Sequence, residues 1–147
     1  MMATAPKLTL LLADDDVIIR LALSDYLRSC GFIVLEAADG AEAKAVLQSG
    51  LAIAALLCDV QIAGGDNGFA LAQWVRRYRP AIEVLLTTTL ANKTRTAASF
   101  CGRYASGRGA SDAPALAGRI RAMSAARRRR ARQAGGVTAK RQRAKPT

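Results

Sequence analysis

Acidic side chains stand at two points where strands of this sequence are expected to end. Asp14, Asp15 and Asp16 follow the apolar run LTLLLA, and Asp59 ends the apolar run IAALLCD. If the two runs are neighbouring parallel strands, their carboxyl ends share one edge of the sheet, and three or four carboxylates meet there. Carboxylates this close repel one another unless a cation or proton intervenes, and oxygen ligands of this kind suit Mg²⁺. The alternative is that the acids face a loop or cap a helix, as Asp16 is placed to do.

Hydroxyl groups follow a further apolar run, IEVLL, where Thr87, Thr88 and Thr89 stand in sequence. A hydroxyl there could bond an oxygen of a group held over Asp59, although threonines at strand ends are usually structural. Together these residues indicate a carboxylate nucleophile, a divalent metal and a hydroxyl around a transferred phosphoryl group. Asp59 would attack in line and form an aspartyl phosphate.

The composition excludes several other chemistries. The chain has no histidine, which removes histidine triads, histidine-ligated zinc and imidazole proton shuttles. Its three cysteines are isolated and odd in number, so we expect packing residues rather than a disulfide framework or a metal motif. No apolar run is long enough to span a membrane, and the first residues lack a signal-peptide pattern, which predicts a cytoplasmic protein.

The positive charge is concentrated at the carboxyl end. Of the net charge of +11, residues 1–123 carry +2 and residues 124–147 carry +9, with no acidic residue in the latter segment. We therefore predict one domain over residues 6–124 and a basic, disordered tail over residues 125–147. The tail is a candidate for non-specific binding of nucleic acid phosphates, and the simpler alternative is a solvated end to the last helix.

The order of apolar runs and helical patterns predicts the architecture. Strand patterns at 8–13, 32–37, 53–59 and 82–88 alternate with helical patterns, and a last helix begins near Asp112, with Pro114 in its first turn. Such a βαβ series implies a parallel sheet with right-handed crossovers and helices on both faces. Residues 91–111 give a weaker signal, and we expect them to be atypical.

With these motifs in place, the chain resembles the receiver domain of bacterial two-component response regulators, over residues 8–90 and again near 112–124. The resemblance implies an α/β, flavodoxin-like, doubly wound sheet of five parallel strands in the order 2-1-3-4-5. It also implies bound Mg²⁺ and one role for each matching residue. Asp14 and Asp15 match the metal-binding pair, Asp59 the phosphoacceptor and third acidic ligand, Gln61 the residue that lends a backbone carbonyl to the metal, and Thr88, or alternatively Thr87, the hydroxyl.

The resemblance fails at the fifth strand, which the family ends with a lysine and a proline. Counting back from Asp112, these positions hold Gly109 and Ala110. Arg108 lies one residue away, where a strand side chain points to the opposite face, and Lys93 lies in the preceding segment. Tyr104 is the only tyrosine near the family's aromatic switch position. We therefore expect a receiver that accepts phosphate but signals poorly, because the pocket lacks its lysine.

Two functions are compatible with this pattern. The first is a single-domain receiver that takes a phosphoryl group on Asp59 from a sensor histidine kinase or a histidine phosphotransfer protein and acts on a downstream protein. On this interpretation the chain is not an enzyme beyond Mg²⁺-assisted phosphorylation and dephosphorylation of itself. The alternative is a degenerate receiver that binds a protein or nucleic acid through its surface and basic tail, independently of phosphate.

Overall fold

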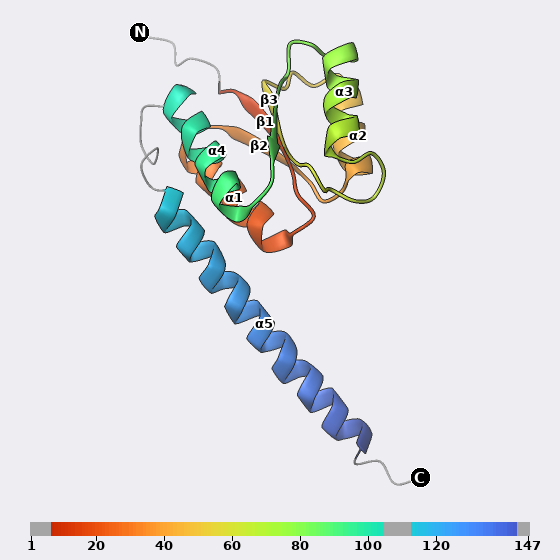
Figure 1. The fold of residues 1–147 in the computed structure, drawn as a ribbon, viewed down its shortest axis with the longest axis vertical. Helices are drawn as coiled ribbons and strands as arrows, with labels where there is room; N and C mark the ends of the chain where they lie inside the picture. The colour runs from red at the N-terminus through yellow and green to blue at the C-terminus, as the bar shows by residue number, and fades with distance from the viewer. Residues whose placement is uncertain (1–6, 105–112, 144–147) are drawn as a thin grey trace.

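The computed structural model describes residues 7–104 and 113–143, with side chains described as far as residue 135. Its centre is a parallel sheet of four strands in the order β2-β1-β3-β4 (Figure 1). The strands are β1 (Thr9–Ala13), β2 (Ile33–Ala37), β3 (Ala55–Asp59) and β4 (Glu83–Thr87). Leu11 of β1 lies between Leu35 of β2 and Leu56 of β3, so β1 and β3 are neighbours, as the acidic motif requires.

In the described ranges, five helices accompany the sheet: α1 (Val17–Ser29), α2 (Gly40–Gln48), α3 (Gly68–Tyr78), α4 (Leu90–Tyr104) and α5 (Ala113–Arg143). Helices α2 and α3 cover one face, and α1 and α4 cover the other (Figure 1). Polar residues cap the N-termini of helices α2 and α3. The Asp39 carboxylate accepts from the backbone N–H of Glu42 in α2, and the Asn67 side chain accepts from Ala70 in α3.

Alternation along the strands divides the core into two clusters. Leu10 and Leu12 of β1 pack with Leu57 of β3 toward α1 and α4. Leu11 and Leu56 point to the opposite face, toward α2 and α3. Because side chains alternate across a strand, both faces of the sheet are apolar and both are covered, which accounts for the nearly uninterrupted apolar runs in the sequence.

The predicted order is confirmed for four strands, but the fifth strand is not formed in the described part of the chain. The resemblance places the fifth strand at residues 100–108, of which residues 100–104 are instead the last turn of α4. The reason is a stripe at helical spacing, in which buried side chains recur three to five residues apart over Lys93, Thr94, Ala97, Ala98 and Cys101. Residues 105–112, with Gly109, Ala110, Arg108 and Asp112, lie outside the described residues.

A disulfide joins α4 to the end of α1, contrary to the expectation that all cysteines are simple packing residues. Cys30 caps α1 and Cys101 lies on the buried side of α4, with their Cα atoms 5.9 Å apart. Cys58 remains a free, buried thiol on β3. The pairing could not be derived from the sequence, because the two residues are separated by 71 positions and meet only when α4 covers the same face as α1.

The last helix departs from the composition-based expectation of a disordered tail. Pro114 lies in the first turn of α5 as predicted, and Ala113, Leu116 and Ile120 are buried against the domain. The helix then continues to Arg143, through most of the segment predicted to be disordered. Alanine, arginine, glutamine and lysine, which dominate this segment, are among the strongest helix formers. Within the described residues, no helix is both long and apolar enough to cross a membrane.

The cysteine arrangement predicts the result of thiol titration under non-reducing conditions. The native protein is expected to react slowly, because Cys58 is buried and its burial beside Asp59 raises the pKa of the thiol to about 12. Denaturant without reductant should expose one thiol per chain, and reduction should release three. Reduction should also lower the free energy of unfolding by about 4 kcal/mol, because the disulfide closes a loop of 71 residues. Three reactive thiols in denaturant alone would contradict the pairing, and Cys58→Ser is the control that removes the single free thiol.

Candidate functional site

The carboxyl ends of β1 and β3 bring the predicted acids together. Asp14 directly follows β1 and Asp59 ends β3, each two residues beyond a leucine that points toward α1 and α4. By alternation, both carboxylates point to that same face. One carboxylate oxygen from each of Asp14, Asp15 and Asp59 lies within 4.8 Å of the others. This confirms the central geometric prediction that the N-terminal acids and Asp59 meet at one place.

The cluster has one buried member and a more accessible rim. Asp14 is only 1% exposed, whereas Asp15 is exposed and Asp59 is partly exposed. One Asp14 oxygen accepts from the backbone N–H of Asp16 at 2.9 Å, and Arg20 donates to the Asp14 carbonyl oxygen at 2.8 Å. These bonds hold the turn after β1, so Asp14 forms the floor of the site while Asp15 and Asp59 border its opening.

The third acid of the triplet has a different role, as the sequence suggested. Asp16 is the N-cap of α1, and its carboxylate accepts from the backbone N–H groups of Ile18 and Ile19 at 3.0 and 3.1 Å. A capping carboxylate stabilises a helix by about 1 kcal/mol. Asp16 is thus a structural residue that sets where α1 begins, and it is not part of the cluster.

A lysine from α4 occupies the centre of the site. The Lys93 ammonium lies 2.6 Å from an oxygen of Asp14 and 2.8 Å from an oxygen of Asp59, and the residue is 4% exposed. Burial by itself would lower the pKa of Lys93, but its hydrogen bonds and charge interactions with Asp14 and Asp59 outweigh burial and raise that pKa. The prediction that the pocket lacks a lysine is therefore wrong, because the cation comes from a helix rather than from strand five.

Thr88, Thr89 and Asn92 explain how Lys93 reaches the acids. The Thr89 hydroxyl accepts from the Asn92 backbone N–H, and the Asn92 side chain accepts from the Thr88 backbone N–H at 2.9 Å. This reciprocal arrangement caps α4 directly after β4. Lys93 lies one turn into the helix, so its side chain extends over the strand ends. Lys93 stands at helical spacing from Ala97 and Cys101, but this signal does not show which face of the sheet α4 covers.

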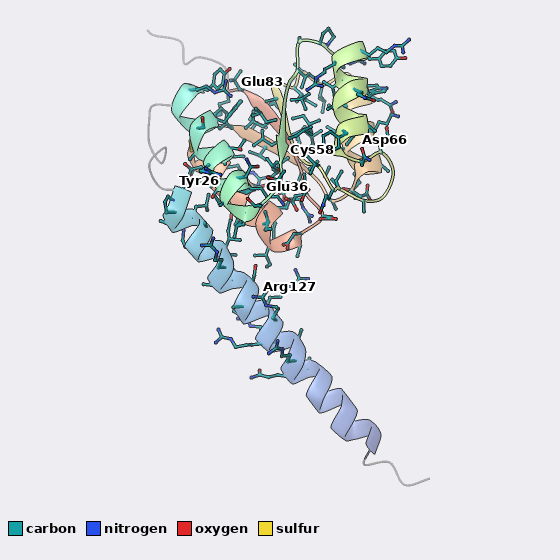
Figure 2. The ribbon with its side chains drawn as sticks, viewed as in Figure 1. Tyr26, Glu36, Cys58, Asp66, Glu83 and Arg127 are labelled. Carbon is teal, nitrogen blue, oxygen red and sulfur yellow. A yellow bond between two sulfur atoms is a disulfide. The ribbon has the colours of Figure 1, made fainter. Side chains whose placement is uncertain are left out.

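Burial dominates the electrostatics around the acids. Removal from water raises the pKa of Asp14 despite the opposing hydrogen bonds and charge of Lys93. Burial also raises the pKa of the Cys58 thiol, and the carboxylates of Asp59 and Asp14 add to the effect. Figure 2 shows Cys58 within the domain, between the helical layers. The base of the site is thus removed from water, and three carboxylates share one ammonium there, so a further cation would balance the remaining negative charge.

The remaining predicted residues border the same edge. The backbone N–H of Gln61 donates to an Asp59 oxygen at 2.8 Å, so the loop after β3 folds back over the carboxylate. Thr87 is buried and pairs in register with Asp59, whereas Thr88 is exposed one residue beyond the end of β4. Tyr104 is half exposed at the end of α4 and contacts Phe100, rather than lying on a strand.

A glycine permits the close approach of α3 to the acceptor strand. A Cβ atom at Gly68, the first residue of α3, would lie 2.6 Å from the Asp59 carbonyl oxygen and 2.7 Å from the Cα atom of Val60. Both neighbours are backbone atoms, so a larger residue would displace the end of β3. Gly68 therefore allows α3 to begin directly against the end of β3, a role that the glycine-rich loop alone did not reveal.

Comparisons with known proteins agree with this geometry. The response regulator receiver domain family matches residues 10–104. A response regulator receiver protein from Sinorhizobium medicae is similar in structure, with 30% identity, a TM-score of 0.53 and coverage of 56% of this chain and 66% of that one. A receiver protein from Pseudomonas putida shows 26% identity, a TM-score of 0.52 and coverage of 58% and 70%. No curated protein matches the chain.

A third similar structure is that of a complex. The response regulator protein TrrA from Thermotoga maritima, in complex with Mg²⁺ and beryllium fluoride, matches with 26% identity and a TM-score of 0.51, over 55% of this chain and 69% of that one. The family match spans most of the chain and includes the acidic cluster at the ends of β1 and β3. The chain therefore belongs to the response regulator receiver domain family.

Proposed function

We propose that this receiver domain accepts a phosphoryl group on Asp59. The observation that carries the proposal is the cluster of Asp14, Asp15 and Asp59 around the Lys93 ammonium, within 2.8 Å of two of the carboxylates. The donor would be a phosphohistidine of a sensor histidine kinase or of a histidine phosphotransfer protein, the partners typical of receiver domains. The chain carries no histidine that could serve as an internal donor.

The donor set fits Mg²⁺. The carboxylates of Asp14, Asp15 and Asp59 are hard oxygen ligands, and we assign the backbone carbonyl of Gln61, which adjoins Asp59, as a further ligand. When bound, Mg²⁺ would neutralise negative charge on the phosphoryl oxygens. The complex of the similar Thermotoga protein with Mg²⁺ and beryllium fluoride supports this assignment.

Asp59, Thr88 and Lys93 each have a separate role in the proposed transfer of the phosphoryl group. A carboxylate oxygen of Asp59 attacks phosphorus, an O–P bond forms, and the bond from phosphorus to the donor nitrogen breaks. Thr88 is the better candidate for the hydroxyl that binds a phosphoryl oxygen, because it is exposed beyond β4 while Thr87 is buried in the sheet. Lys93 must exchange at least part of its contact with Asp59 for the incoming phosphoryl oxygens.

Lys93 takes the part that the family gives to its strand-five lysine. In the unphosphorylated domain it pairs with Asp59 at 2.8 Å, and a compact ammonium on a flexible stem can follow a new oxygen. A fixed cation beside a transferring group contributes about 2–4 kcal/mol of charge stabilisation. Lys93 is placed to supply this stabilisation.

The second candidate function is that of a degenerate receiver that binds its partner independently of phosphate. The observation that favours it is the arrangement after β4, where α4 covers the face of α1 and no fifth strand is formed in the described residues. A surface built differently from that of other receivers need not respond to phosphate. The two functions differ in whether Asp59 is required for capture of the partner.

Phosphorylation tests the first function. Incubation with acetyl phosphate and Mg²⁺ is expected to add the mass of one phosphoryl group, which peptide mapping should place on Asp59, and EDTA should abolish it. Lys93→Met should slow the reaction by roughly 30- to 1000-fold while leaving the same acceptor, since it removes the fixed cation. Measurement is by intact mass over time, on variants whose circular dichroism matches the parent chain.

Asp59→Asn and Asp25→Asn form a matched pair for this experiment, because Asp25 is an exposed acid on α1 away from the cluster. Only the change at Asp59 should abolish the mass shift. The proposal that Asp59 accepts a phosphoryl group would be refuted if the parent chain gains no mass with Mg²⁺ and either acetyl phosphate or a phosphorylated histidine phosphotransfer protein. The degenerate-receiver function would then stand, provided that Asp59→Asn captures the partner as well as the parent does.

The contacts of Lys93 also predict that the free energy of unfolding depends on Mg²⁺. Without Mg²⁺, Lys93→Met leaves two carboxylates without their shared cation, and the free energy of unfolding should fall by about 3–5 kcal/mol. Mg²⁺ should restore more stability to this variant than to the parent, because the ion no longer competes with the ammonium. Lys44→Met is the matched control, since Lys44 forms a partly exposed ion pair with Asp66 at 2.9 Å and should cost less than about 1 kcal/mol. Urea unfolding with EDTA and with Mg²⁺ measures both, and equal losses for the two variants would refute the central role of Lys93.

A further inference from the structure

The second half of α5 is largely exposed as far as its side chains are described. The first turns of the helix are held by buried Ala113, Leu116 and Ile120, but Met123 is already 44% exposed. From Arg127 to Gly135 every residue is exposed. Figure 1 shows this part of α5 extending away from the domain, and Figure 2 places Arg127 beyond the packed side chains. We call residues 124–143 the basic arm.

The basic arm lies in the segment that carries the whole net charge of the molecule. Of 22 lysines and arginines, 11 precede residue 113, where all 11 acidic residues also lie. Residues 1–112 are therefore neutral in sum, and residues 113–147 carry +11 with no acid. Among the described residues, no arginine of α5 forms an ion pair with the domain. The charge is thus free to meet an external anion.

The distribution of charge around the arm limits the kind of partner. Arg127, Arg128, Arg129 and Arg130 are consecutive, so at 100° per residue they point to all sides of the helix. A helix that lies on a membrane surface needs an apolar face opposite its basic face, and a coiled-coil helix needs an apolar seam. Beyond Met123 the arm offers only alanines and Val137 as apolar side chains. Both of those partner classes fit poorly, and a partner with anionic groups on more than one side of the helix fits well.

We propose that the basic arm binds double-stranded DNA through its phosphates. The major groove of B-DNA admits one α-helix and has a phosphate chain on each wall, which matches arginines on every side. Twenty helical residues span about 30 Å, close to one turn of the duplex. The deep, narrow major groove of RNA duplexes does not admit such a helix. Contacts made mainly to phosphates give binding with little sequence preference, and this binding is independent of the acceptor function of Asp59.

The test is fluorescence anisotropy of the full chain with a labelled DNA duplex of about three helical turns, at salt concentrations from roughly 50 to 200 mM. The plot of log affinity against log salt is expected to have a slope of about −4 or steeper, from contacts with at least four phosphates. Arg128→Gln with Arg129→Gln should flatten the slope by about 2 and weaken binding roughly 10- to 100-fold at the lowest salt. Arg128→Lys with Arg129→Lys should keep most of the affinity.

The matched control is Arg76→Gln with Arg77→Gln, which removes two adjacent, exposed arginines from α3. This pair should leave the affinity and the slope nearly unchanged, as should Asp59→Asn. Equal losses from the α3 and α5 pairs would mean that net charge alone attracts DNA, and would overturn the assignment to the arm. Absence of binding at the lowest salt would also overturn it, as would tighter binding to phosphatidylserine vesicles than to DNA in a parallel flotation assay.

Discussion

A buried ammonium shared by two carboxylates is the interaction on which the arrangement of this receiver depends. Asp14 is almost fully removed from water, and an unpaired carboxylate there would be strongly destabilising. Lys93 offsets that cost only if β1, β3 and the first turn of α4 are in the correct positions, because it must contact Asp14 and Asp59 together. The capping contacts of Thr89 and Asn92 help to position the first turn of α4. The absence of a side chain at Gly68 lets α3 pack directly against the end of β3.

The source of the lysine changes how the domain is built after β4. In the pattern that the family implies, the cation arrives from a strand, whereas here it arrives from a helix that packs on α1 and is tied to it by Cys30 and Cys101. Helix α4 therefore contributes both to the site, through Lys93, and to the core, through Ala97 and Phe100. Strand β4 is the last strand in the order found among the described residues, and most of its residues are half-buried. Both features are typical of an edge strand. Within the described residues, a helix thus supplies the cation that the family takes from a strand.

The sequence predicted the features that depend on local pattern. Apolar runs located the four strands, and acids at two strand ends located the cluster, because parallel strands place their carboxyl ends together. The cap at Asp16 followed from residue type alone. Lys93 and the Cys30–Cys101 pair could not be found in this way, since each depends on which face of the sheet α4 covers. The stripe that decides this face contains small and polar residues, so burial rather than hydrophobicity defines it.

One core cluster connects the helix that carries Lys93 with the base of the basic arm. Lys93 lies on the same helix as Phe100 and Cys101. The side chains of Phe100 and Cys101 pack in the cluster that also holds Leu116 and Ile120 of α5. A rigid displacement of α4 would therefore disturb the base of the basic arm, and close-packed interiors resist such displacement. The long stem of Lys93 allows its ammonium to move without the helix, because four methylene groups separate the charge from the backbone. Movement of the ammonium between Asp59 and a phosphoryl oxygen thus requires no change in α5, which is consistent with an arm whose affinity for DNA is set by its own charge.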